Sequence, residues 1–217
     1  MNRRDVLKSA ALLGVALPGA AATAAQTTPH IALPAAQTDG GLPLMQALAR
    51  RRSWRQFSER KLPPQVLSNL LWAACGVNRP ESGMRTAPSA HNAQEIELYL
   101  AMEDGLYFYE HLLHALQPLK ALDLRARTGF QSFAADAPVN LIFVADLARV
   151  GGASDDHMLY AAADTGYISQ NVYLYCASEG LATVARGWVE RNSLAKAMGL
   201  KPDHRIILAQ SVGYPAA

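Results

Sequence analysis

The segment from Met158 to Glu179 constrains the fold of this 217-residue chain more than any other, because it predicts one long, mostly buried helix. Gly180 follows it, at the position where a left-handed residue commonly ends a helix. The helix carries more apolar surface than one face packed on a core requires. The residues concerned are Tyr160, Tyr167, Ile168, Val172, Tyr173 and Leu174. We therefore expect a second copy of the chain to cover part of this helix.

The rest of the sequence predicts shorter helices and strands that alternate along one domain. The predicted helices start at Leu44, run from Pro63-Pro64 to Gly76, cover Pro118 to Arg127, and run from an Asn192 cap to Gly199. The predicted strands start at Glu95, cover Leu106 to Tyr109 after an Asp104-Gly105 turn, and then cover Val139 to Ala145, Leu181 to Ala185 and Arg205 to Val212. Asn78 to Arg85 is expected to be a loop. This combination favours an α+β fold with a central mixed sheet flanked by helices.

Residues 1–25 have the features of an export signal. Arg3-Arg4 is a twin-arginine pair, Ala10 to Leu17 is a mildly apolar run, and Ala22-Thr23-Ala24 is a small-residue cleavage pattern. The segment resembles a Tat signal, which predicts passage through the Tat translocase and a periplasmic location. The apolar run is too short for a stable membrane anchor. Residues 26–42 are expected to be a flexible arm, and residues 43–217 a single domain.

The charge of the mature chain is balanced. Removing Arg3, Arg4, Lys8 and Asp5 from the 20 basic and 18 acidic residues leaves 17 of each. This balance gives no electrostatic reason to expect nucleic acid or an anionic membrane as a partner. Cys75 and Cys176 lie in apolar helical patterns, which favours buried thiols, although an oxidising compartment would permit a disulfide.

An arginine cluster follows the first predicted helix of the domain. The segment Arg50 to Phe57 places four guanidinium groups and the Ser53 hydroxyl close together. The rigid donor fork of arginine matches phosphate oxygens, so the cluster indicates a phosphate site. The alternative is a solvated basic helix end, where cations complement the helix dipole. Phe57 is expected to belong to the core.

Two further segments have patterns that bear on chemistry. Thr86 to Gln94 contains a Pro-Ser pair followed by Asn92, and its alternative interpretation is an ordinary Asx-type turn before a strand. Gly180 to Gly187 combines a helix end, a strand and a loop. The alternative interpretation of Gly187 is an ordinary glycine at the end of a strand. Glycine at that position permits close approach to a planar ring.

The three segments, in this order, resemble the nitroreductase superfamily of FMN enzymes. The resemblance implies that Arg51, Ser53 and Arg55 hold the FMN phosphate and ribityl chain, with a less defined role for Arg52. It also assigns roles to the other two segments. The backbone of Pro88, Ser89 and Ala90 would follow the flavin ring, Asn92 would bond its polar edge, and a backbone N–H at Arg186-Gly187 would approach N5.

The same resemblance implies an obligate homodimer with two FMN sites at the subunit interface, each built from both chains. The implied reaction is ping-pong hydride transfer through flavin N5, to or from a small organic substrate. His91 is a possible substrate contact, and no other side chain is expected to be catalytic. The alternative is a periplasmic flavin- or ligand-binding protein without turnover. The substrate, the electron donor and the direction of electron flow stay open.

Within the superfamily the chain is most similar to the SagB/ThcOx-type dehydrogenase branch, through Arg85 to Ala90, Glu97 to Tyr99 and Gly105 to Tyr107. Azoline-oxidising members continue the Pro-Ser-Ala loop differently from His91 to Gln94, so azoline oxidation does not carry over. Many members add a basic C-terminal arm to the phosphate site. The sequence stops at Ala217, which leaves that charge to the Arg51 cluster.

Two other sequence patterns bear on bound metals and nucleotides. His111 and His114, with Asp155, Asp156 and His157 further on, offer metal-ligand side chains, but nothing in their spacing fixes convergence, so no metal is expected. The sequence has no Gly-x-Gly-x-x-Gly pattern for a separate dinucleotide fold. A nicotinamide donor, where family members use one, stacks directly on the flavin.

Overall fold

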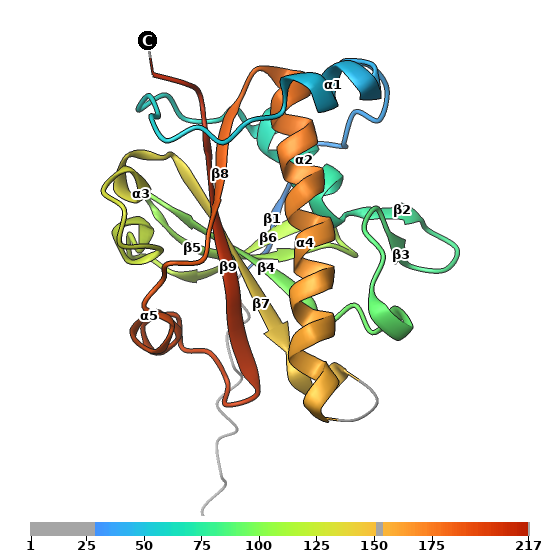
Figure 1. The fold of residues 1–217 in the computed structure, drawn as a ribbon, viewed down its shortest axis with the longest axis vertical. Helices are drawn as coiled ribbons and strands as arrows, with labels where there is room; N and C mark the ends of the chain where they lie inside the picture. Colours follow the sequence, from blue (N-terminus) through green and yellow to red (C-terminus); the bar gives the residue numbers. More distant parts are fainter. Residues whose placement is uncertain (1–28, 151–153, 217) are drawn as a thin grey trace, which may run out of the picture.

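The computed structural model describes residues 29–150 and 154–216, and the side chains of residues 154 and 155 are outside this description. The predicted signal peptide, residues 1–25, lies outside the described residues. The fold is organised around a seven-stranded sheet in the order β1-β6-β5-β4-β7-β9-β8 (Figure 1). Its strands are β1 Ile31–Ala32, β4 Ile96–Met102, β5 Gly105–Glu110, β6 Ala115–Lys120, β7 Val139–Asp146, β8 Ala182–Arg186 and β9 His204–Gly213.

All pairings in this sheet are antiparallel, so the predicted mixed sheet was wrong. In the chain, a long helix connects β7 to β8. In the sheet, β9 lies between these two strands and pairs antiparallel with both. The crossover therefore spans a gap of one strand, and the final strand of the chain fills it.

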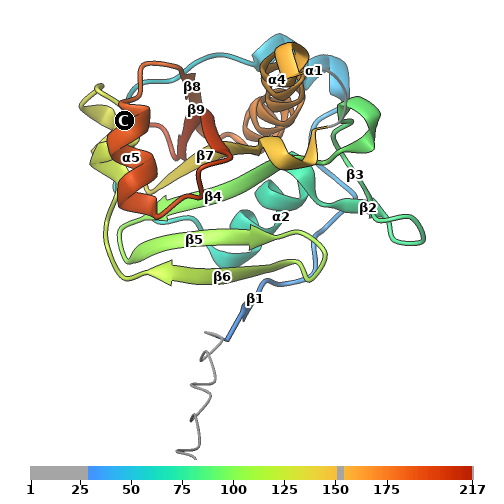
Figure 2. The ribbon, with the colours of Figure 1, turned by 90° about the horizontal axis from the view of Figure 1, so that it is seen from below.

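Helices cover the two faces of the sheet unequally. The helices are α1 Leu44–Arg50, α2 Pro64–Cys75, α3 Phe133–Asp136, α4 Ser154–Glu179 and α5 Arg191–Met198. Figure 2 shows α2 and α4 on one face and α5 on the other. Alternate strand residues serve the two faces: Leu98 and Phe143 join the core under α2 and α4, whereas Tyr99 and Val144 join the core under α5. Within the described residues, no helix is both long and apolar enough to cross a membrane.

Helix α4 confirms the long predicted helix, and Gly180 ends it with a φ of +69°. Its apolar residues are divided between the core and the exposed surface in a different way from the prediction. Ile168 and Val172 are 3% and 0% exposed and belong to the core under the helix, so they are not interface residues. The exposed stripe is formed by Met158, Leu159, Ala162, Ala163, Gly166 and Tyr167.

The predicted helix over Pro118 to Arg127 was wrong. Residues 115–120 form β6, which pairs with β5 in the register Tyr109↔Leu116, and only residues 125–127 form a single 3₁₀ turn, η2 (Arg125–Arg127). Ala115 and Leu116 are 3% exposed, so burial against the sheet outweighs local helix propensity here. The segment from Asn78 to Arg85, expected to be a loop, contains the small hairpin β2 (Val77–Arg79) and β3 (Met84–Arg85).

Other element predictions were confirmed with small shifts. Helix α2 ends at Cys75 before Gly76, and β4 and β5 form the predicted hairpin. Helix α5 begins one residue before the predicted Asn192 cap. Its cap is Glu190, whose carboxylate accepts a hydrogen bond from the backbone N–H of Ser193 (2.6 Å).

The described part of the predicted arm, residues 29–42, is held along the domain by specific contacts. Strand β1 pairs with the edge of the sheet at β6. The Ser68 hydroxyl donates to the Pro34 carbonyl (2.6 Å), and the Leu42 N–H donates to the Ser178 hydroxyl (2.7 Å). These contacts hold the described part of the arm against α2 and α4.

Both cysteines are buried free thiols, Cys75 at the end of α2 and Cys176 in α4. Burial raises the pKa of Cys75 to about 11 and raises that of Cys176 as well. Phe57 is buried as predicted and forms an isolated bridge with Pro215.

Candidate functional site

The arginine cluster leaves the end of α1 on the surface. Arg51, Arg52 and Arg55 are exposed, and none of them pairs with a carboxylate among the residues that the structure describes. The Arg51 guanidinium lies 5.4 Å from the centroid of the Tyr173 ring, and that of Arg52 lies 5.4 Å from the Trp54 ring. Positive charge gathered without a protein counter-ion is suited to an anionic ligand.

Tyr173 of α4 joins this cluster to β8. Its hydroxyl lies 2.9 Å from the Ser53 hydroxyl and accepts a hydrogen bond from the Ala185 N–H (2.9 Å). The Trp54 N–H donates to the carbonyl of Thr183 (2.9 Å). The structure therefore brings the first and third sequence segments together within one chain. Sequence reasoning placed Tyr173 only in an apolar surface, because no motif marks its hydroxyl.

The Arg186 side chain has a structural role. It is 3% exposed and donates to the Thr128 carbonyl (2.7 Å) and to Asn140 Oδ1 (2.7 Å). Asn140 also accepts from the Ser211 hydroxyl (2.6 Å) and donates to the Ala134 carbonyl (2.7 Å). Burial lowers the pKa of Arg186 to about 10. Its guanidinium is thus committed to this network, and only the backbone remains for the predicted cofactor contact.

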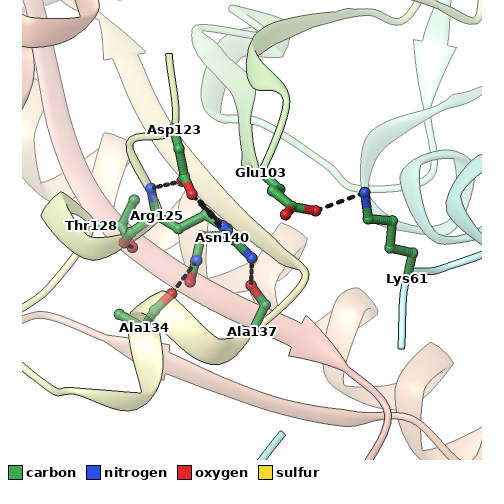
Figure 3. Close-up of polar contacts among 8 residues, drawn as sticks. All are labelled: Lys61, Glu103, Asp123, Arg125, Thr128, Ala134, Ala137 and Asn140. Atoms are coloured by element: carbon green, nitrogen blue, oxygen red, sulfur yellow. Dashed lines mark hydrogen bonds and ion pairs between the residues drawn. The ribbon is translucent and has the colours of Figure 1, made fainter. Parts of the chain in front are cut away.

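The network holds the segment before β7 against β8. Figure 3 shows Asn140 and Arg125 bonded to the backbone of Ala134 and Ala137, at the two ends of α3. Arg125 is in turn held by Asp123 (2.8 Å). This anchored segment is fixed next to the loop that follows β8.

Gly187 lies exposed directly after β8. An added Cβ would meet only Leu208 Cδ2 at 3.7 Å, an ordinary contact, so packing within one chain does not require glycine here. Beside it, Phe130 and Trp188 are 57% and 67% exposed, and their ring centroids lie 5.2 Å apart. An open backbone flanked by two exposed aromatic rings can accommodate a planar ligand.

The Pro-Ser loop has an unusual backbone. His91 and Asn92, in the 3₁₀ turn η1 (Ala90–Asn92), both have a φ of +53°, and Gln94 has a φ of +49°. The loop is closed by the Ser89 hydroxyl, which accepts from the Gln94 N–H (3.0 Å). The side chains of His91 and Asn92 are exposed. Left-handed non-glycine residues are strained and concentrate at functional sites.

Asp164 of α4 anchors this loop. It is 3% exposed, and its carboxylate accepts from the Ala90 N–H (2.8 Å). The His91 ring lies edge-on to Tyr160, one helical turn earlier, with centroids 5.7 Å apart. Sequence reasoning missed Asp164, although a carboxylate inside an apolar helix is itself a signal of a buried polar contact.

Behind the loop lies a buried charged cluster. Glu95 is 0% exposed, and its two carboxylate oxygens have no hydrogen-bond partner in the described part of the chain. Burial raises the pKa of Glu95 to about 7, and the negative charge of Asp164 adds to the rise. Arg85 contacts the His111 ring (3.0 Å) and donates to the Ile96 carbonyl (3.1 Å). Burial and the Arg85 charge lower the pKa of His111 to about 4.

Within one chain, the Pro-Ser loop and the arginine cluster contact α4 at different positions along the helix axis. Asp164 and Tyr173 are nine residues apart on the helix, which corresponds to about 14 Å along its axis. Figure 1 shows η1 near the start of α4 and the end of α1 near its other end. One chain therefore brings together two of the three predicted segments and keeps the third apart.

His111 and His114, two of the candidate metal ligands in the sequence, have different partners. His111 contacts Arg85, whereas His114 lies between the Ser68 hydroxyl (2.7 Å) and the Tyr109 hydroxyl (2.8 Å). These bonds occupy both ring nitrogens of His114.

Comparison with known proteins identifies the family of the chain. A model of the nitroreductase family matches residues 48–214. A predicted nitroreductase of Methanocaldococcus jannaschii is 32% identical over 171 residues, which are 73% of this chain and 85% of the relative. A crystal structure of a predicted nitroreductase from Ralstonia eutropha has a TM-score of 0.84 and 42% identity, and covers 89% of this chain and 93% of its own.

A more distant neighbour is a chain of the Escherichia coli microcin synthetase McbBCD complex, with a TM-score of 0.67, 19% identity, and coverage of 85% and 78% of the two chains. At this identity the likeness concerns the fold alone. Together the matches define the chain as an oxidoreductase. It belongs to the nitroreductase family, whose members generally bind FMN.

Proposed function

We propose that this protein is an exported FMN-dependent oxidoreductase that acts on a small organic substrate. One observation carries the proposal: the Tyr173 hydroxyl contacts both Ser53 and the backbone of β8. The arginines next to Ser53 in the sequence have no carboxylate partner in the described structure. Bound FMN would supply ping-pong hydride transfer at N5, with both substrates using the same pocket in turn.

The residues fit this cofactor at two of its parts. The exposed guanidinium groups of Arg51 and Arg55, with the Ser53 hydroxyl, supply charge-assisted donors for a phosphate. Tyr173 fixes Ser53 at 2.9 Å, so this donor is positioned before ligand binding. At Gly187 the exposed backbone and the absent side chain leave room for a ring.

We propose further that the Pro-Ser loop completes the site of a second subunit in a homodimer. The distance between the loop and Tyr173 along α4 supports this arrangement, because one chain does not bring them together. The exposed stripe of α4 supplies an apolar surface for such a dimer, and α1 beside it exposes Leu44, Met45 and Leu48. Asn92 and His91 would then face the ring and the substrate of the partner's site.

The SagB/ThcOx-type branch remains our proposal for the subfamily, on the sequence of residues 85–90. We also propose periplasmic location after passage through the Tat translocase, on the twin-arginine pair. Changing Arg3 and Arg4 to lysine should retain the precursor in the cytoplasm in folded form. Normal periplasmic accumulation of that variant would exclude the Tat assignment.

The test of the function begins with the colour of the purified protein. We expect a yellow protein that releases FMN on denaturation, at one FMN per chain. Stopped-flow mixing with NADH, NADPH and other hydride donors should bleach the flavin absorbance, and a second substrate should restore it. A protein that neither contains nor takes up FMN contradicts the proposal. Bound FMN that no donor reduces indicates the non-catalytic binding protein instead.

A further inference from the structure

Three metal-ligand side chains converge on the sheet face opposite α4. Glu97, Asp146 and His204 each offer a ligand atom, and these atoms all lie within 4.8 Å of one another. His204 Nε2 lies 3.2 Å from Glu97 Oε2. Ligand atoms bonded to one ion at about 2.0–2.2 Å lie up to about 4.4 Å apart, so small side-chain shifts bring all three onto one ion.

The sheet itself places these side chains together. Asp146 and His204 are direct cross-strand partners at the end of β7 and the start of β9. Glu97, on the neighbouring strand β4, pairs with Val144, two residues before Asp146. Residues two apart share one face of a strand, so all three side chains lie on the face that also carries Tyr99 and Val144. A rigid sheet is a suitable support for a ligand set.

The charge of this cluster is unbalanced without a cation. Glu97 contacts His204, and Asp146 lies within ion-pair distance of no basic side chain among the described residues. Asp146 Oδ1 accepts from the Ala148 N–H (3.2 Å), which leaves its other oxygen for a different partner. The Tyr99 hydroxyl donates to Glu97 Oε2 (2.9 Å).

A simple ion pair between Glu97 and His204 accounts for two of the three side chains and leaves Asp146 unexplained. His204 is 7% exposed, so its ring is held in place by burial. A cavity of about 390 Å³ adjoins the cluster, and Glu97 and His204 belong to its lining. The cavity gives an ion a path from solvent and leaves room for water to complete its coordination.

We propose that Glu97, Asp146 and His204 form a binding site for a divalent transition-metal ion, with Zn²⁺ and Mn²⁺ as the best matches to one imidazole and two carboxylates. Two carboxylates and a neutral imidazole balance a double positive charge. The site lies on the α5 face of the sheet. Tyr173 and Asp164, which contact the segments predicted to bind FMN, belong to α4 on the opposite face. The metal-ion site is thus separate from the proposed flavin site.

The test uses untagged full-length protein, stripped with a chelator and titrated with Zn²⁺ or Mn²⁺ by calorimetry. We expect one ion per chain and a rise of several degrees in Tm at saturation, because an ion that binds only the folded state stabilises it. The variants Glu97→Gln, Asp146→Asn and His204→Gln should each weaken binding by about tenfold or more. Asn at 146 keeps an oxygen acceptor for Ala148, so the ion-free variant should remain folded.

Two controls separate this site from other sources of binding. Asp203→Asn changes an exposed carboxylate next to His204 and should bind the ion as the wild type does. Arg51→Ala alters the proposed FMN site and should also leave ion binding unchanged. The proposal is overturned if the wild type binds neither ion, or if folded Asp146→Asn and His204→Gln proteins bind it with wild-type affinity.

Discussion

At the scale of single residues, Arg51 offers the sharpest test of the phosphate site. Its guanidinium lies over the ring of Tyr173, whose hydroxyl contacts Ser53, and no protein carboxylate pairs with it in the described structure. Arg51→Ala should weaken FMN binding by about 1.5 to 3 kcal/mol, the range for a hydrogen bond to a charged group. Fluorescence titration of the FMN-free protein measures this loss.

The matched control for that variant is Arg127→Ala. Arg127 is exposed and forms no ion pair among the described residues. Arg79 is unsuitable, because its guanidinium donates to the Arg85 carbonyl (2.8 Å) and supports the β2–β3 hairpin. Equal affinity of the Arg51 and Arg127 variants would mean that the arginine cluster is merely solvated.

Glu95 predicts a pH dependence of stability. In the unfolded chain its pKa returns to about 4.3, whereas burial raises it to about 7 in the fold. Between these values the folded state binds the additional proton, so its free energy of unfolding falls as pH rises from about 4.5 to 7. Glu95→Gln removes this titration and should flatten the profile by roughly 1 to 3 kcal/mol.

Urea unfolding at several values between pH 4.5 and 8 measures this effect. Glu81→Gln, a change of an exposed carboxylate in the β2–β3 turn, is the control and should keep the wild-type profile. A Glu95→Gln profile that is parallel to that of the wild type would show that the carboxyl group has an ordinary pKa in the fold.

At the scale of elements, periodicity was sufficient where one strand or helix buries a regular face. Helices α2 and α4 and the β4–β5 hairpin were predicted from spacing and end signals alone. Strand β6 was not, because its identity depends on pairing with β5 and on burial of Leu116, which are properties of the tertiary fold. The antiparallel sheet was missed for the same reason, since nothing local places β9 between β7 and β8.

The candidate site likewise contains residues that sequence motifs mark and residues that only the tertiary fold brings in. Sequence motifs predicted roles for Ser53 and Asn92, because their residue types and spacing carry the family pattern. They could not identify Tyr173 or Asp164, which act through contacts with segments more than 70 residues away in the chain. They assigned Arg186 a backbone contact only, and gave no sign that its side chain is bonded to Thr128 and Asn140.

At the scale of the whole molecule, the structure changes the way in which the proposed dimer has to be tested. Val172 lies in the core under α4 and is 0% exposed, so a charge there would unfold the monomer and say nothing of assembly. Tyr167 is 51% exposed and lies beside Gly166, whose surroundings are open within 4 Å. Tyr167 is therefore the position at which a charge reports on an interface.

The proposed dimer predicts that Tyr167→Glu costs both assembly and FMN while the monomer stays folded. A carboxylate in an apolar interface has no partner, and its desolvation opposes association. Light scattering gives the mass, FMN absorbance gives occupancy, and circular dichroism confirms the fold. Leu112→Glu is the matched control, because Leu112 is 67% exposed but lies in the turn between β5 and β6 and does not belong to the exposed stripe of α4. A Tyr167→Glu monomer that retains tight FMN binding would contradict the shared site, since each chain would then hold a complete site of its own.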